Sequence, residues 1–404
     1  MTRTRSHIDP ATNPSPSPND FHTGRVLTIS AAHGVHDTYT AFLPSLLPIF
    51  ISTLALTNTE AGLLTVFLQA PSLLQPFIGH LADRVSLRYL VILAPAVSAV
   101  MMSVLPVAPG YGALVLFLLL AGLSSASIHS VGPVMAGRLS GSRLGRGMGF
   151  WMVGGELGRT LGPIIIVGAI QLLTVSSTPW VMTAGLLTSL VLFLLLRGVA
   201  GRPVASVAAL PWRQALRSLG PLLLPLAGII VVRSFVVSAL TTYLPTFLSE
   251  GGSGLVAAGA SLSVLEGAGV GGALLGGSLS DRVGRRTVLF VSFLVTPLLM
   301  GAFLVAHGWM RVPLLLLLGL SGLSVGPVIM ALVQESLPGN PALANGLYMA
   351  LSFILRSGVI LVIGLIGDVL SLRWAFAVSA VMALVGLPLI AWLPISSLDA
   401  VEAA

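Results

Sequence analysis

The chain has 404 residues, of which 55% are hydrophobic and 8% are charged, and its mean hydropathy is +0.99. Because a soluble domain carries about 25% charged residues, this chain cannot cover its surface with polar groups, and we predict an integral membrane protein. The formal net charge is +7, but no basic stripe interleaved with aromatic residues indicates nucleic-acid binding, and the absence of cysteine excludes a disulfide framework and thiol chemistry.

The chain begins with a polar, proline-rich segment, residues 1–24, which we predict to be a disordered cytoplasmic tail. A bilayer-spanning helix needs about 20 apolar residues. The predicted spans are 26–51, 61–80, 89–107, 112–137, 147–172, 180–196, 220–248, 257–280, 287–306, 313–337, 345–369 and 374–396. The sequence therefore predicts an all-α membrane protein with twelve transmembrane helices.

The longest connection, the predicted cytoplasmic linker 198–219, divides the chain into six-helix halves at 25–197 and 220–396, followed by a cytoplasmic tail at 397–404. If the N-terminus is cytoplasmic, Arg311 and Arg373 alone among the arginines outside the spans fall on the other side. This asymmetry follows the positive-inside rule. It predicts a multi-pass protein of the cytoplasmic (inner) membrane with both termini cytoplasmic.

Two stretches repeat at one constant offset. GHLADRVSLR starts at Gly79 after the second span, and GSLSDRVGRR starts at Gly277 after the eighth. A weaker echo links AFLPSLLP, from Ala41, to TYLPTFLS, from Thr242. The halves are therefore predicted to be parallel repeats, as in some secondary transporters.

The repeated loop resembles the signature G-x-L-A-D-R-x-G-R-R of the major facilitator superfamily, although Ser86 and Leu87 depart from it in the first copy. The resemblance implies the major facilitator fold and a loop that controls conformation. An acid at the end of a helix can attract a neighbouring helix N-terminus, which suggests a latch for the outward-open state. The predicted motif residues are Gly79, Asp83, Arg84, Gly277, Asp281, Arg282 and Arg285.

A narrower resemblance links HGVHDTYTAFLPSLLPIF, from His33, to the first helix of fosmidomycin-resistance-type efflux transporters. Further matches are LLQPFIGHLADR from Leu73, His129, VGGELGRTLGP from Val153 and QESLPG from Gln334. Ser130 and Glu156 depart from the residues usual in that family. Gly158, Gly162 and Pro163 resemble the start of an antiporter motif; close packing of small residues is the alternative.

Six charged residues lie well inside the predicted spans: Asp37, Glu156, Arg159, Arg233, Glu266 and Arg356. Each costs at least about 2.5 kcal/mol at the middle of a bilayer unless it faces water or a partner. On a helix, Asp37 shares a face with His33 and His36, and a carboxylate beside imidazoles can exchange protons near neutral pH. We predict proton coupling at Asp37, His36, Glu266 and Glu156, against the alternative of a structural hydrogen-bond cluster.

The intramembrane arginines suggest an anionic substrate, because a guanidinium binds carboxylate or phosphate through paired hydrogen bonds. The predicted substrate-binding residues are His33, Arg233, Arg356, Arg159 and His129. The alternative is that the arginines neutralise the buried acids and touch no substrate.

The sequence thus predicts a secondary active transporter, with proton-coupled efflux by antiport of a small anionic or amphipathic compound through alternating access. Uptake or exchange of an organic anion is one alternative, and a membrane-embedded enzyme or sensor is another. Motifs for zinc proteolysis, serine hydrolysis and ATP binding are missing, so we predict no enzyme, no cofactor and no metal. The expected partners are a small-molecule substrate, protons and the lipid bilayer, with no nucleic acid, and the chain is expected to be a monomer.

Overall fold

The computed structural model describes residues 21–82, 86–141, 144–196, 212–335 and 341–393, and every regular element in these ranges is helical. The first half contains α1 (Thr23–Thr40), α2 (Leu43–Leu54), α3 (Asn58–Gln69), η1 (Ala70–Leu74), α4 (Gln75–Ala82), α5 (Arg88–Val104), η2 (Leu105–Val107), α6 (Tyr111–Leu139), α7 (Leu144–Leu173), η3 (Val175–Val181) and α8 (Met182–Leu195).

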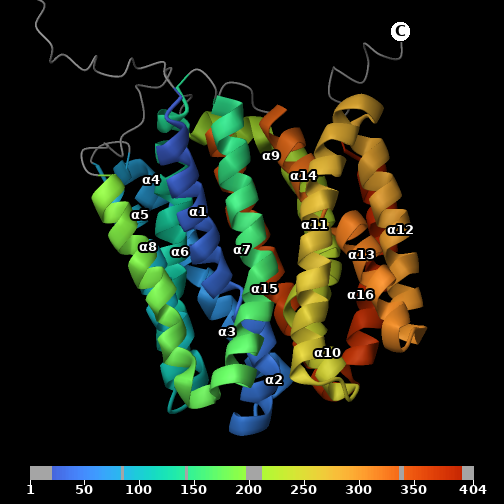
Figure 1. Ribbon diagram of the computed structural model, residues 1–404. Coiled ribbons are helices and arrows are strands. Elements are labelled where there is room, and N and C mark those ends of the chain that lie inside the picture. Colours follow the sequence, from blue (N-terminus) through green and yellow to red (C-terminus); the bar gives the residue numbers. More distant parts are fainter. Residues whose placement is uncertain (1–20, 83–85, 142–143, 197–211, 336–340, 394–404) are drawn as a thin grey trace, which may run out of the picture.

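The second half contains α9 (Trp212–Ser238), η4 (Ala239–Tyr243), α10 (Leu244–Glu250), α11 (Leu255–Val283), α12 (Arg285–Val305), η5 (Gly308–Met310), α13 (Arg311–Gly322), α14 (Val325–Glu335), α15 (Pro341–Val369) and α16 (Leu372–Ala391). The first half lies beside the second, with the helices of both running roughly parallel to one axis (Figure 1). Helix α9 begins inside the predicted linker, because WRQAL consists mainly of good helix formers.

Ten helices in the described ranges are long and apolar enough to cross a membrane. They correspond to the third through twelfth predicted spans. The first predicted span falls on the consecutive helices α1 and α2, and the second falls on α3, η1 and α4, so neither forms one long helix. The all-helical membrane architecture is confirmed, and the twelve-span count rests on combining these shorter helices.

The similar stretches AFLP and TYLP coincide with breaks in the first and seventh predicted spans. Pro44 stands in the first turn of α2, and Pro245 stands in the first turn of α10. Since proline has no N–H to donate and its ring clashes with the preceding turn, α1 ends at Thr40, and a π-helical turn at Ala239–Tyr243 separates α9 from α10. The two halves are thus interrupted at equivalent places, one by a helix break and the other by a π-helical turn.

Helix α1 packs directly on the backbone of α7 through three glycines spaced one turn apart. A Cβ added at Gly154 would clash with the Ser30 carbonyl oxygen, and one at Gly158 would clash with that of Gly34. Gly162 faces the Thr38 carbonyl in the same way. The stretch that resembles an antiporter motif therefore has a packing role here, which holds Asp37 against α7.

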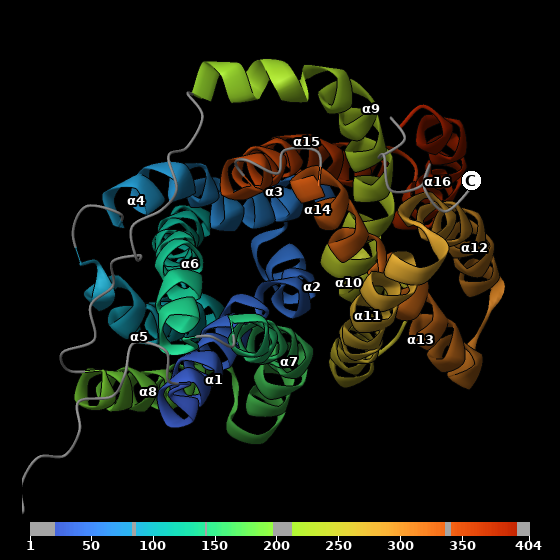
Figure 2. The ribbon, with the colours of Figure 1, turned by 90° about the horizontal axis from the view of Figure 1, so that it is seen from above.

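The halves meet mainly along three pairs of helices, α2 with α10, α3 with α15, and α7 with α11. Viewed from above, α3 runs beside α15 and α7 beside α11 (Figure 2). The first pair joins equivalent spans, the first and the seventh, whereas the other two pairs join the second span to the eleventh and the fifth span to the eighth.

Hydrogen bonds join the halves at the end of α15, in what we call the cross-half cap. The carboxylate of Asp368 accepts hydrogen bonds from the backbone N–H groups of Asn58 (2.6 Å) and Thr59 (3.0 Å) and from the Thr59 hydroxyl (2.6 Å). The hydroxyl of the fully buried Tyr243 lies 2.9 Å from the Ile360 carbonyl and 3.2 Å from that of Asn58. The second half thus caps the N-terminus of α3 in the first.

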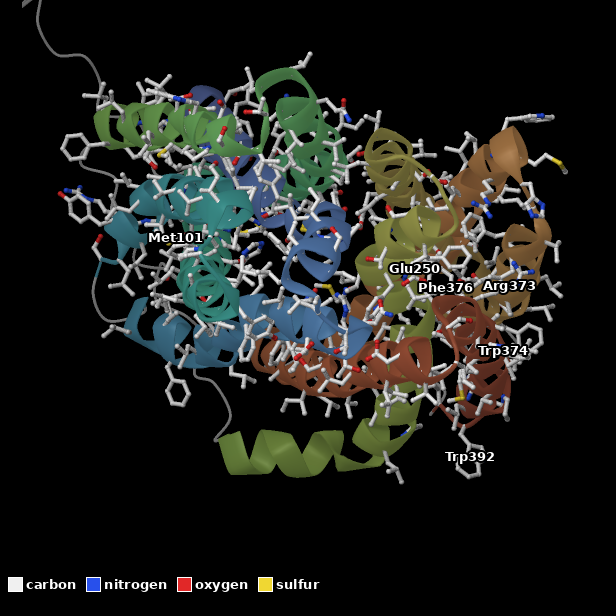
Figure 3. All side chains as sticks on the ribbon, turned by 90° about the horizontal axis from the view of Figure 1, so that it is seen from below. Met101, Glu250, Arg373, Trp374, Phe376 and Trp392 are labelled. Atoms are coloured by element: carbon white, nitrogen blue, oxygen red, sulfur yellow. The ribbon has the colours of Figure 1, made fainter. Side chains whose placement is uncertain are left out.

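The cross-half cap lies at the end of the bundle opposite the start of α1 and the end of α16 (Figure 1). In the view from the end that carries the cross-half cap, Trp374 and Trp392 point away from the bundle at the rim of the second half (Figure 3). Both are well exposed, at 60% and 77%. Outward tryptophans are typical of the belts that face the membrane–water interface.

Candidate functional site

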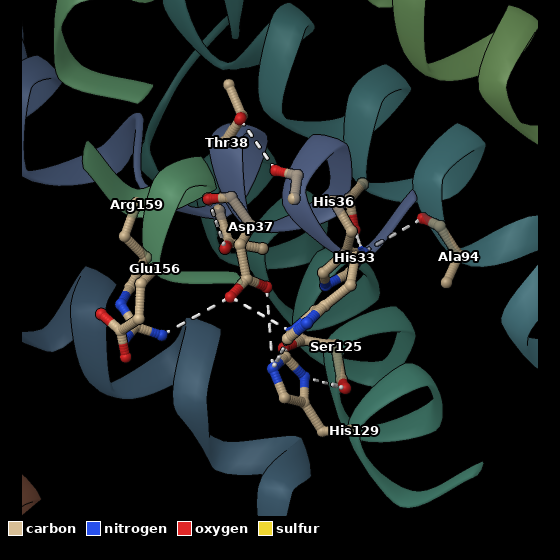
Figure 4. A network of polar contacts seen from close by, with 12 residues as sticks. His33, His36, Asp37, Thr38, Ala94, Ser125, His129, Glu156 and Arg159 are labelled. Atoms are coloured by element: carbon tan, nitrogen blue, oxygen red, sulfur yellow. Dashed lines mark hydrogen bonds and ion pairs between the residues drawn. The ribbon is translucent and has the colours of Figure 1, made fainter. Parts of the chain in front are cut away.

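The centre of the candidate site is Asp37, whose side chain is 3% exposed between α1, α6 and α7. His33 Nε2 lies 3.4 Å from Asp37 Oδ2, and His129 Nε2 lies 3.6 Å from Asp37 Oδ1. The two Nε2 atoms are 3.2 Å apart. A residue from α6 thereby joins two from α1, as Figure 4 shows.

Arg159 on α7 supplies a fixed positive charge to this group. Its Nη1 lies 3.5 Å from Asp37 Oδ2, and its Nη2 pairs with the carboxylate of Glu156. The side chain of Arg159 is 42% exposed and that of Glu156 is 20% exposed, so both are more open than Asp37. Glu156 and Arg159 therefore pair within α7, and Arg159 also reaches Asp37.

His36 turns away from this group although it is close in sequence. Its Nδ1 lies 2.9 Å from the hydroxyl of Ser98 and 3.4 Å from the Ala94 carbonyl, both on α5. It is fully buried. It is linked to the site through its ring, whose centroid is 5.9 Å from that of His129.

Trp151 was not among the predicted site residues, yet it positions His33 in two ways. Its carbonyl lies 2.9 Å from His33 Nδ1, and its indole stacks on the imidazole with centroids 3.9 Å apart. Gly155 leaves the space that the imidazole occupies, since an added Cβ would lie 2.5 Å from His33 Cε1. Ser125, which accepts from His129 Nδ1 through its carbonyl at 2.8 Å, was also missed.

The second half contributes a more positive group. Arg356 on α15 donates from Nη2 to the hydroxyl of Thr241 at 3.0 Å, and Arg233 on α9 passes beside Gly326. The Nε atoms of both arginines are buried without a hydrogen-bond partner in the described ranges. Glu266 on α11 lies within electrostatic range of Arg356 and of Arg159.

A metal ion could be held by His33, Asp37 and His129 on distance alone, because their ligand atoms lie within 4.8 Å of one another. The guanidinium of Arg159 is 3.5 Å from Asp37, however. A fixed positive charge so close opposes a divalent cation at the same carboxylate. We therefore assign no metal to this group.

The predicted motif residues lie away from this site. Gly79 is in α4, and Gly277, Asp281 and Arg282 are in the last turns of α11. Gly284, which follows, has a φ of 87° that favours glycine, and Arg285 donates to the Ser280 hydroxyl. Asp83 and Arg84 lie outside the described residues.

Helices that cross a membrane in two repeated halves, with charged side chains gathered inside, are the architecture of a secondary transporter. A family model for the Major Facilitator Superfamily matches residues 29–359 and 275–401. The chain belongs to this superfamily. It is accordingly a multi-pass membrane transporter and not an enzyme.

Two curated relatives share most of its length. The chain is 26% identical over 370 residues to the fosmidomycin resistance protein of Escherichia coli (strain K12), covering 89% of this chain and 90% of the relative. It is 24% identical over 347 residues to the uncharacterized MFS-type transporter YfnC of Bacillus subtilis (strain 168), covering 81% and 82%. The predicted resemblance to fosmidomycin-resistance-type transporters is confirmed at this level.

Solved transporters have the same fold. A bacterial homolog of the human lysosomal transporter Spinster, inward-facing and occupied, matches with a TM-score of 0.78 and 14% identity over 95% of this chain and 99% of that chain. A D-xylose–proton symporter matches with a TM-score of 0.73 and 14% identity over 93% and 99%. These likenesses concern the fold alone.

Proposed function

We propose that this protein is a proton-coupled efflux transporter that exchanges protons for a small anionic or amphipathic compound by alternating access. The observation that carries the proposal is the separation of charge between the halves. In the first half, Asp37 and Glu156 outnumber Arg159. In the second, Arg233 and Arg356 outnumber Glu266. One group favours a cation, and the other favours an anion.

Proton coupling is assigned to the first group. A buried carboxylate with imidazoles beside it can exchange a proton near neutral pH, and Asp37 is the least exposed acid there. Glu156 and Glu266 extend the path toward the second half, since both act on Arg159. His36 supports the group from the α5 side.

Substrate binding is assigned to Arg233 and Arg356, with Arg159, His33 and His129 on the facing half. A guanidinium cannot lose its charge in a protein, and neither Arg233 nor Arg356 forms an ion pair with an acid in the described ranges. An anionic group on the substrate would supply the missing counter-charge and accept hydrogen bonds from the buried donors.

The signature loops are assigned to control of conformation. Asp281 and Arg282 lie in the last turn of α11, and Gly79 lies in α4; both helices reach the end of the bundle where α1 starts (Figure 1). With Asp83, Arg84, Gly277 and Arg285, they would latch neighbouring helices in one state. This role carries no information about the substrate.

Two observations support the proposed direction of transport and the proposed membrane location. A relative named for fosmidomycin resistance favours efflux, and the arginine asymmetry favours both termini in the cytoplasm and a cytoplasmic membrane. We expect the protein to act as a monomer in the bilayer. Uptake or exchange of an organic anion remains the second candidate, because the Arg233 and Arg356 group would serve either direction.

The test uses purified protein in liposomes with an imposed pH gradient and fosmidomycin as the probe. We expect Arg233→Lys and Arg356→Lys to weaken probe binding, because lysine offers a point charge in place of paired donors. Arg373→Lys makes the same change at an exposed position outside the Arg233 and Arg356 group. This control variant should bind the probe as the wild type does. Unchanged affinity in both interior variants would refute the anion site.

A further inference from the structure

The protonation of His33 and His129 is fixed on one side by backbone carbonyls. His33 Nδ1 lies 2.9 Å from the Trp151 carbonyl, and His129 Nδ1 lies 2.8 Å from the Ser125 carbonyl. A carbonyl oxygen only accepts hydrogen bonds. Both Nδ1 atoms must therefore carry hydrogen, and when the rings are neutral both Nε2 atoms are bare acceptors.

These two acceptors face each other and a carboxylate. The Nε2 atoms are 3.2 Å apart, and Asp37 oxygens lie 3.4 and 3.6 Å from them. Asp37 Oδ1 is buried and has no hydrogen-bond partner in the described ranges. Lone pairs converging at these distances repel one another unless a hydrogen lies between them.

We propose that the coupling proton is held between the Nε2 atoms of His33 and His129, with Asp37 as its permanently ionised counter-ion. This proposal rests on the proton coupling proposed above. It moves the proton from Asp37 to His33 and His129, which then bind the proton in place of the substrate. The proton sits on one Nε2 and is donated to the other, so it can pass between α1 and α6. Asp37 balances the charge and is not itself the carrier.

The surroundings favour one positive charge at this place. Asp37 and Glu156 supply two negative charges against the single positive charge of Arg159, so one bound proton brings the group to neutrality. The indole of Trp151 stacks on the ring of His33, and an aromatic face stabilises a cation by about 0.5–2 kcal/mol. His36 is held by Ser98 on the far side, and Glu266 faces the group from α11, where it interacts electrostatically with Arg159 and with Glu156.

The proton has a route to the pair through His129. The side chain of His129 is 33% exposed, against 5% for His33 and 3% for Asp37. A proton would therefore arrive at His129 and be shared with the buried ring of His33. Opening of the contact between α6 and α1 would separate the rings and release it.

The experiment is a pH titration of the whole protein in nanodiscs with nitrogen-15 in its seven histidines, followed by nuclear magnetic resonance and infrared spectroscopy. His33→Gln and His129→Gln assign the two rings and remove the proton site. His307→Gln, at an exposed position, is the matched control. The melting temperature of each variant checks that it is folded.

We expect the nitrogen signals of His33 and His129 to change together on uptake of one proton, and each Gln variant to lose that joint change and also to lose transport driven by a pH gradient. His307→Gln should lose neither. A protonated carboxyl band that Asp37→Asn removes, while both rings keep the neutral pattern, would overturn the proposal and leave proton coupling standing. A wild type whose transport ignores the pH gradient would overturn the coupling itself, and the titration, which needs no substrate, separates the two failures.

Discussion

The cross-half cap predicts how one substitution changes the balance between the two states of the transporter. Asp368→Asn keeps the shape of the side chain and removes its charge. The carboxylate accepts three hydrogen bonds from the first half, at 2.6, 3.0 and 2.6 Å. A hydrogen bond to a charged group stabilises a contact by about 1 kcal/mol more than one to a neutral group. The Asn variant also loses the attraction between the carboxylate and the N-terminus of α3.

Because Asp368 is exposed, solvent reduces these gains, and we take the total loss as about 2 kcal/mol. That loss corresponds to a roughly 30-fold change in the ratio of the closed to the open form at this end of the molecule. If both termini are cytoplasmic, the cross-half cap closes the outer end, so Asp368→Asn should favour the outward-open state.

The assay uses the absence of cysteine from the native chain. Thr53→Cys in the last turn of α2 and Leu370→Cys just after α15 place spin labels at exposed positions, and electron resonance measures the distance distribution between them. The matched control is Glu60→Gln, which weakens a cap on the same helix, where Glu60 accepts from the Thr57 N–H at 2.9 Å within one half. An equal shift in both variants, or no shift with Asp368→Asn, would show that the hydrogen bonds of Asp368 across the halves do not hold this end closed.

Three further predictions follow from the interior of the molecule. Asp37→Asn should abolish transport driven by a pH gradient and leave substrate exchange largely intact, since the size and polarity stay and the counter-ion is lost; unchanged proton flux in liposomes would exclude Asp37 from coupling. Gly154→Ala should lower the free energy of unfolding by roughly 1–3 kcal/mol, because the added Cβ meets the backbone of Ser30. Gly149→Ala, with open space around it, should show no loss. Equal melting temperatures for the two variants would contradict close packing of α7 on α1. Tyr243→Phe should widen the spin-label distances in the same direction as Asp368→Asn by removing the hydroxyl at the cross-half cap, and a distribution like that of the wild type would exclude this contact.

The fold was predictable because the composition indicates membrane spans and the repeated stretches indicate two similar halves. Apolar segments of bilayer length gave the spans, and the loop copies at Gly79 and Gly277 indicated two equivalent halves. Pro44 and Pro245 were visible in the echo between the halves, but their effect, a helix break in one and a π-helical turn in the other, depends on how each helix packs. The second span was predicted as continuous and is divided by η1, which contains Pro71.

The candidate site was predictable where it depends on charge and not where it depends on backbone atoms. Asp37 and Arg159 are conspicuous because a charge in an apolar span needs a reason. Trp151 acts on His33 through its carbonyl as well as its ring, and every residue has a carbonyl, so no sequence signal marks it. Asp368 lies at a helix end, where an acid can be solvated without a partner, and its three bonds across the halves come only from the tertiary fold.

We propose above that substrate movement and proton movement are coupled in this protein. The most direct measurement places the purified protein in liposomes, imposes a pH gradient with no other gradient, and follows both the probe and the internal pH. We expect the probe to accumulate against its own concentration gradient in exchange for protons, and an ionophore that collapses the pH gradient to stop the accumulation. Probe movement at the same rate with and without the pH gradient, and no change of internal pH as the probe crosses, would contradict it.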